Sequence, residues 1–326
     1  MGDPIGLVEG AKALSQPICK LVEGICAGCG RVYEPIHVKR MAQARAIELN
    51  VIADAMRNNI DVPVLYQEGI VRIDSQDVQN LAHRAAVRVG HQEMTKQLNI
   101  EHIVGQAALN LEDTEAVPDT PVDKDWMMRF FNYAGGVNDE DVQKMWAQVL
   151  TGKIKHPSFI SLRTLDVLRN LSKQDAALFQ KVNEIALISL RGPILYSDGD
   201  FLQTKGIDVY DIVSLVDAGL LSAEGLVKTI PINNDTPITF DNGKYICTIK
   251  TNQSQSDQKI KHGFYAFSQA GKELRGVLGL NSSLESFLQI IRNVKKKNPD
   301  YVYTVHEVIN RDGNIVRYCL HDLFMI

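Results

Sequence analysis

Hydrophobic residues recur every three or four positions through most of residues 1–190, a pattern that predicts amphipathic helices. The strongest pattern lies in residues 125–190, which contain both tryptophans of the chain. Breaks at Gly135, between Gly152 and Pro157, and at Ser172 divide this stretch into four helices. We therefore predict a central helical domain over residues 125–190, in which the tryptophans form part of the core.

Polar residues mark where two helices of this domain begin. Asn138 or Asp139 is expected to cap the second helix, because each has a side-chain oxygen that can accept a backbone N–H. Ser172, with Asp175 three residues on, resembles a capping box in which Asp replaces the usual Glu or Gln. The fourth helix should therefore start at Ser172.

The N-terminal segment, residues 5–29, carries a heptad-like apolar seam. Pro17 should kink or divide it. One interpretation is a helical arm buried against its own chain, a second is a self-association helix, and a third is a helix on a membrane surface. Few cations lie on the polar face, which disfavours the third. Under the second interpretation the oligomer interface would comprise Leu7, Leu14, Ile18, Leu21 and Ile25.

The segments up to residue 124 alternate between helical and irregular patterns. A second apolar stripe within residues 1–59, with Arg45 at one of its positions, completes an N-terminal helical assembly arm. Residues 60–111 predict a connector with a short extended piece, then long helices with a bend near Gly90. Residues 112–124 are acidic and contain two prolines, so we expect a linker there.

Residues 191–280 predict a different kind of module. A helix over residues 208–221 is followed by strands within residues 226–250, and then by a strand and a helix over residues 264–279. This order and spacing resemble a winged-helix module. The helix at the position of the recognition helix has no Lys or Arg and contains three aspartates, Asp208, Asp211 and Asp217. This charge argues against binding in the DNA major groove, so we expect the module to bind protein instead.

Residues 281–326 predict a helix, a run of three lysines and a β-hairpin that turns through Asp312-Gly313. The fold class is thus mainly α with a C-terminal α+β part: a helical N-terminal arm, a helical bundle, a winged-helix-like module and a terminal hairpin.

The hairpin is the strongest candidate for chemistry. The predicted register places His306 opposite Cys319 and puts Arg317 and His321 on the same face. Two imidazoles beside cations could cleave RNA by general acid–base catalysis, so His306, His321 and Arg317 are candidate catalytic residues. The same face could bind zinc, or it could simply be an exposed polar surface or a subunit contact.

Three cysteines crowd near the N-terminus, Cys19, Cys26 and Cys29, with His37 nearby. Cys26 and Cys29 supply half of a structural zinc site, which needs four ligands. Alternatively they are small thiols packed in a helical seam, or a redox pair. No other cofactor is expected, because the chain has no phosphate-binding loop, dinucleotide fingerprint or nucleophile elbow.

Composition narrows the class of protein further. The formal net charge of −4 argues against a protein dominated by nucleic-acid affinity. Five cysteines do not resemble a secreted disulfide framework, and no signal peptide or apolar run of about 20 residues is evident, so a cytoplasmic protein is expected. Asp198-Gly199-Asp200 is read as a turn, with a metal site as its alternative.

The words DWMMRFF, NDEDVQKMWAQVLTGKIKHPSFISLRTLDVLRNLS and FSQAGKEL resemble the bacterial family called domain of unknown function 2806. Ser158 stands where that family commonly has glycine. The resemblance implies a bacterial cytoplasmic protein with a helical body and supplies no catalytic residues. The word WAQVLTGKI is also similar to helical proteins of abortive infection, which points towards phage defence.

Two functions are expected from these features. The first is a homo-oligomeric interaction or sensor protein that recognises a protein partner, such as a phage or host component, in antiviral defence. The second is a toxin, a ribonuclease activated by oligomerisation, with RNA as the substrate of the hairpin cluster. Contact with a membrane surface is not expected under either function.

Overall fold

The computed structural model describes residues 15–29, 64–67, 70–73, 81–189, 192–231, 238–251, 259–279, 283–312, 315–319 and 324–325. The chain divides into two compact units, Met1–Leu165 and Asp166–Ile326. The fold is mainly α with a C-terminal α+β part, as the sequence predicts. The second stripe of the predicted assembly arm, with Arg45, lies outside the described residues, as do Leu7, Leu14 and His37.

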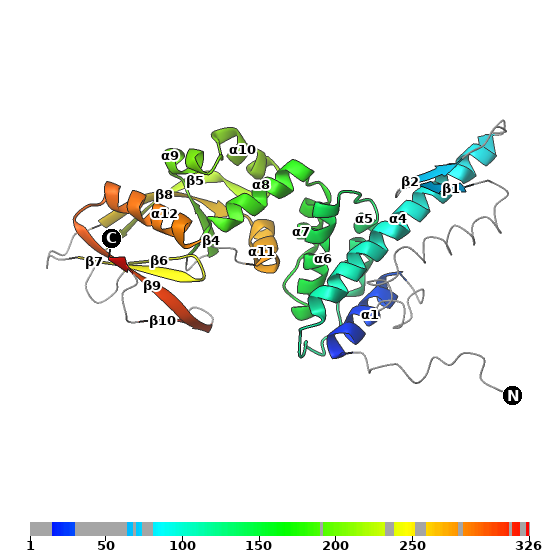
Figure 1. The fold of residues 1–326 in the computed structure, drawn as a ribbon, viewed down its shortest axis with the longest axis horizontal. Helices are drawn as coiled ribbons and strands as arrows, with labels where there is room; N and C mark the ends of the chain where they lie inside the picture. Colours follow the sequence, from blue (N-terminus) through cyan, green and yellow to red (C-terminus); the bar gives the residue numbers. More distant parts are fainter. Residues whose placement is uncertain are drawn as a thin grey trace. The chain divides into compact units, whose positions relative to one another are not determined.

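The first unit is built from helices that pack side by side, together with a small hairpin (Figure 1). Helix α4 runs without interruption through Gly90, where a bend was predicted. The hairpin occupies the predicted connector. The elements are α1 (Gln16–Cys29), β1 (Val64–Gln67), β2 (Ile70–Ile73), α4 (Leu81–Leu111), α5 (Lys124–Ala134), α6 (Glu140–Lys155) and the start of α7 (Leu162–Arg169).

Aromatic rings form the centre of this unit. The Phe130 ring stacks on Trp126 at a centroid distance of 5.2 Å and meets Trp146 edge-on at 5.1 Å. All three side chains are buried. Lys153 is also buried, with its Nζ 4.9 Å from the centre of the Trp126 ring. The tryptophans are therefore core residues, as predicted.

Helix α6 ends later than the sequence suggests. Gly152 lies inside the helix, which continues to Lys155. A glycine inside a helix costs about 1 kcal/mol. Two contacts formed by the extra turn offset that cost: Ile154 is buried, and the Lys153 Nζ donates a 2.7 Å hydrogen bond to the Ile160 carbonyl.

Most of the acidic segment 112–124 has no regular structure, as predicted, and only its last residue belongs to α5, but the segment is held to α1 at Val117 and Asp119. The Gln16 side chain donates to the Val117 carbonyl and accepts from the Val117 N–H, both at 2.8 Å. The Val117 side chain is buried. This segment is therefore part of the first unit rather than a boundary between domains.

The second unit contains a large antiparallel sheet in the order β10-β9-β7-β6-β3-β4-β8-β5, with β11 also paired to β9. Its strands are β3 (Leu187–Ser189), β4 (Gly192–Tyr196), β5 (Leu221–Pro231), β6 (Ile238–Asp241), β7 (Tyr245–Thr251), β8 (Lys259–Phe267), β9 (Tyr301–Asp312), β10 (Ile315–Tyr318) and β11 (Phe324–Met325). Strands β3 and β4 were not predicted, and the division between the two units falls inside α7. The stretch 125–190 therefore contributes to both units.

The helices of this unit are α8 (Lys173–Glu184), α9 (Gly199–Thr204), α10 (Val209–Asp217), α11 (Gln269–Leu278) and α12 (Leu284–Lys297). Helix α12 lies against β7 and β9 (Figure 1). Its apolar face, which includes Phe287, Ile291 and Val294, is buried there, whereas its lysine-rich end is more exposed. Helix α12 also contacts α9.

The predicted helix caps are confirmed. The Asp139 carboxylate accepts the N–H groups of Asp141 and Val142. At the start of α8, the Ser172 Oγ accepts the Asp175 N–H, and the Asp175 carboxylate accepts the Ser172 N–H, each at 3.1 Å. Both halves of the capping box are therefore present.

A Ser172→Ala variant is expected to lower the free energy of unfolding by about 1 kcal/mol, the usual cost of losing an N-cap. Burial by itself raises the pKa of Asp175, but the hydrogen bonds from Ser172 and Ser214 together lower it by more than burial raises it. The net pKa therefore lies below 3.8. The stability that this carboxylate contributes is present above pH 3.8 and is lost as the pH falls through its lowered pKa. Chemical denaturation at pH 7 and pH 3 should therefore show a smaller difference between wild type and variant in acid.

The matched control is Gln174→Ala at an exposed position of the same turn, which should change stability by less than about 0.5 kcal/mol. Equal losses in the two variants would contradict the role of the capping box.

Candidate functional site

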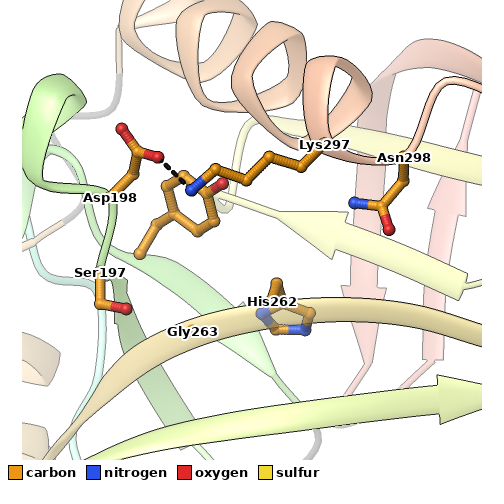
Figure 2. A pocket seen from close by; sticks show the side chains of 7 residues that line it. Ser197, Asp198, His262, Gly263, Lys297 and Asn298 are labelled. Atoms are coloured by element: carbon orange, nitrogen blue, oxygen red, sulfur yellow. Dashed lines mark hydrogen bonds and ion pairs between the residues drawn. The ribbon is translucent and has the colours of Figure 1, made fainter.

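The second unit contains a cavity of about 320 Å³ between the end of β4, the start of α9, the middle of β8 and the end of α12 (Figure 2). The end of β4 and the start of α9 supply one wall, β8 supplies the floor, and the end of α12 supplies the opposite wall. The lining residues are Tyr196, Ser197, Asp198, His262, Gly263, Lys297 and Asn298.

Backbone pairing fixes one wall of the cavity to its floor. Tyr196 lies opposite Phe264 in the β4–β8 ladder, and the Ser197 N–H donates to the Gly263 carbonyl at 3.1 Å. Asp198 then leaves the sheet as the N-cap of α9, where its carboxylate accepts the Phe201 N–H at 2.9 Å. The Asp198-Gly199-Asp200 segment, predicted as a turn, is therefore a helix start that aims one carboxylate into the cavity.

An ion pair closes one side of the cavity. The Lys297 Nζ lies 2.5 Å from the Asp198 Oδ2 and 6.0 Å from the centre of the Tyr196 ring. The two charged side chains differ in their surroundings, since that of Asp198 is 10% exposed and that of Lys297 is 57% exposed. The carboxylate is thus a fixed part of the wall, whereas most of the lysine side chain faces solvent.

The surroundings keep Tyr196 neutral and Asp198 ionised. Burial, with a contribution from the Asp198 charge, raises the pKa of Tyr196 to about 12, so the phenol is neutral at physiological pH. Burial also raises the pKa of Asp198, but Lys297 and the Phe201 N–H lower it by more, and the net pKa lies below its ordinary value. The cavity therefore offers a neutral aromatic face, a carboxylate and an ammonium group. Such a set is suited to binding and orienting a small polar ligand.

The predicted hairpin register is wrong by two residues. Strand β9 extends to Asp312, which pairs with Ile315 instead of lying in the turn. Arg317 consequently lies opposite Asn310, and a bulge after it places Tyr318 opposite Val308. Up to the bulge, the shift of two residues keeps each side chain on its predicted face but moves it along the strand.

This register separates the candidate catalytic residues. Arg317 is exposed and pairs four residues from His306, a distance of about 13 Å along a strand. His306 is buried, pairs with Ile246 of β7 and has its ring centre 4.8 Å from that of Tyr318. His321 lies outside the described residues. The structure therefore does not bring Arg317 to His306 as the ribonuclease hypothesis requires.

The cysteines can be placed only in part. Cys19 is exposed and Cys26 is half-buried on α1, whereas the side chain of Cys29 lies outside the described residues. Among the residues that the structure describes, no three His, Cys, Asp or Glu side chains are grouped so that they could hold a metal ion. Zinc binding by Cys26 and Cys29 stays a prediction.

The described part of the N-terminal seam is covered by its own unit. Ile18, Leu21 and Ile25 are buried, and α1 packs against α5. The approach is so close that a Cβ on Gly24 would lie 2.9 Å from the Cε of Met127. Pro17 lies in the first turn of α1, where its missing N–H costs no hydrogen bond. These contacts support the interpretation of a buried arm over that of an oligomer interface.

A surface that sequence analysis missed lies on α10. Val209, Tyr210 and Val213 are 63%, 78% and 50% exposed, although all three are apolar or aromatic. Ile212 and Leu215 face the core. We call the three exposed residues the α10 outer face. Its sequence signal is that α10 carries more apolar residues than one buried face can hold.

Comparison with known proteins finds a family model that matches part of the chain, but no activity. The family model "Protein of unknown function (DUF2806)" matches residues 83–192, about a third of the chain, and confirms the predicted resemblance over that segment. No curated protein and no solved structure matches the chain. None of the described helices is both long and apolar enough to cross a membrane.

Proposed function

We propose that this protein is a recognition protein that binds a protein partner through the α10 outer face. The observation that carries the proposal is the exposure of three neighbouring apolar side chains on a single helix. Val209 and Val213 are one helical turn apart, and Tyr210 lies beside them. Exposed aromatic and branched side chains that are clustered in this way are typical of protein interaction sites.

The position of α10 in the second unit supports this proposal. Helices α9 and α10 connect β4 to β5, and β8 pairs with both of these strands in the order β4-β8-β5. With α8 ahead of them, these elements follow the order of a winged-helix module, with β6 and β7 inserted between β5 and β8. Helix α10 then stands where a winged-helix protein has its recognition helix.

The charge of α10 indicates what kind of partner fits. Asp208, Asp211 and Asp217 surround the apolar residues, and the helix has no Lys or Arg. Phosphates of a nucleic acid would be repelled. A two-fold contact with α10 of a second copy would place like charges together. We therefore assign a partner that presents Lys or Arg side chains around an apolar centre.

A photo-crosslinking amino acid at position 210 of the full chain, expressed in its native cells, tests this proposal. We expect a discrete adduct with another protein, whose crosslinked segment contains basic and apolar residues. The adduct should disappear when Val213→Asp is added, because a charge would then face the apolar centre of the contact. Circular dichroism should show an unchanged fold, because Val213 is half exposed.

The matched control carries the same crosslinker at position 309 on β9, where Ile309 is 71% exposed. Equal adduct yields at the two positions would overturn the proposal. Crosslinks at position 210 to a second copy of the chain or to nucleic acid would overturn it as well.

Homo-oligomerisation and a role in phage defence stay predictions. The oligomer would need a surface other than the part of α1 that is covered by α5. The ribonuclease alternative is not favoured, because Arg317 and the buried His306 do not converge.

A further inference from the structure

We propose that the cavity between β4, β8 and the end of α12 binds a small ligand that carries an ammonium group, and that Lys297 occupies the ammonium position in the absence of that ligand. The residues that carry this inference are Tyr196, Asp198 and Lys297. It is independent of the α10 outer face.

The first argument is the geometry around the lysine nitrogen. The Lys297 Nζ lies against a carboxylate, the Asp198 Oδ2, and within 6.0 Å of the centre of the Tyr196 ring. Cations are attracted to the electron-rich face of an aromatic ring, and the negative charge of a carboxylate balances the positive charge of the cation. The position that Nζ occupies therefore has the properties of an ammonium-binding site (Figure 2).

The second argument is the difference in exposure between the partners. Asp198 is 10% exposed and is also held by the Phe201 N–H, so it cannot leave the wall. Losing its cation would leave a buried carboxylate uncompensated, which is strongly unfavourable. Lys297 is 57% exposed and can turn into water at little cost.

This difference determines the charge of the ligand. An anion would compete with Asp198 for Lys297 and would leave the carboxylate without its partner. An ammonium group would replace Lys297 and keep the carboxylate paired. The site therefore favours a cationic group over an anionic one.

The remaining wall indicates the size and polarity of the ligand. A cavity of about 320 Å³ lies at the lower end of the range for small-molecule sites. Ser197 and Asn298 line the part away from the ion pair and can form hydrogen bonds with the rest of the ligand. We infer a primary amine of about the size of an amino acid, with further polar groups.

Isothermal titration of the full chain with the twenty amino acids, cadaverine and glutarate tests the inference. Cadaverine and glutarate have the same chain length, with ammonium groups in one and carboxylates in the other. We expect binding by at least one of the amines and none by glutarate. Binding of glutarate alone, or of none of these compounds to either wild type or Lys297→Ala, would overturn the inference.

Variants give a sharper test, because the inference fixes the sign of their effects. Lys297→Ala removes the internal competitor and should tighten amine binding by roughly 5-fold. Asp198→Asn should abolish binding while keeping α9 capped, since Asn is an equally good N-cap. The control Lys296→Ala removes an exposed lysine from the same turn and should change the affinity by less than about 2-fold. Weaker amine binding by Lys297→Ala would overturn the inference.

Discussion

A Gly271→Ala variant is expected to lose the folded C-terminal unit. A Cβ at this position of α11 would lie 2.1 Å from the carbonyl oxygen of Leu220 and 3.1 Å from its carbonyl carbon. Such an overlap with backbone atoms cannot be relieved by a change of side-chain rotamer. We expect the free energy of unfolding to fall by about 4 kcal/mol or more, which exceeds the usual cost of overpacking a protein core.

Neighbouring hydrogen bonds prevent the backbone from moving away. The Leu220 carbonyl accepts the Ser268 N–H at 3.0 Å, and the Ser268 Oγ donates to the Gly219 carbonyl at 2.5 Å. Gly219 itself has a φ of +76°, so the chain turns sharply there. The start of α11 is therefore fixed against the start of β5.

The matched control is Gly199→Ala in α9, where a Cβ would meet nothing within 4 Å. This variant should be as stable as wild type or more stable by about 0.5 kcal/mol, because alanine restricts the unfolded chain. Urea unfolding followed by circular dichroism compares the two variants. A Gly271→Ala protein that unfolds within about 1 kcal/mol of wild type would refute the steric argument.

An Arg275→Met variant is expected to lower the free energy of unfolding by about 3 kcal/mol or more. The Arg275 side chain is buried and donates to the Asn183 carbonyl at 2.8 Å, to the Asn183 Oδ1 at 2.5 Å and to the Ala186 carbonyl at 3.4 Å. Methionine fills a similar volume but leaves these oxygens without their donor. Burial lowers the pKa of Arg275 to about 10, with Asp241 acting in the opposite direction, so the group is charged at neutral pH.

Arg292→Met on the exposed side of α12 is the control for a lost arginine, and it should change stability by less than about 0.5 kcal/mol. Differential scanning calorimetry of the two variants measures the contrast. Equal melting temperatures would show that the bonds of Arg275 to the end of α8 contribute little.

Features encoded over a few residues could be predicted from the sequence. The capping box at Ser172 and Asp175 is one example, because both partners lie within one turn of the same helix. The burial of Trp126 and Trp146 is another, because each occupies an apolar position in a regular helical pattern. Local periodicity and capping chemistry suffice for such features.

Features that depend on distant segments could not be predicted. The hairpin register depends on how far β9 continues, and β9 is also held by β7 on its other side. The need for glycine at position 271 arises from Leu220, which is far away in the sequence. The cavity likewise combines three separate segments, of which two stood out beforehand, at Asp198 and in the lysine run that ends at Lys297, but nothing in the sequence indicated that they meet.

The charge of α10 could be predicted from the sequence, but its exposed apolar face could not. The absence of Lys and Arg from this helix already argued against reading of DNA, and that argument holds for the observed α10. Which of its apolar residues are exposed depends on where the helix packs, and the sequence pattern alone did not indicate it.

The affinity of the partner captured at position 210 for purified variants tests the central claim most directly. Biolayer interferometry should show that Val213→Asp weakens binding by about 30-fold or more, as expected for a residue at the centre of an interface. Ile309→Asp, which places the same charge on β9, should leave the affinity within about 2-fold of wild type. Equal affinities for wild type and Val213→Asp would contradict the assignment of the α10 outer face as the binding surface.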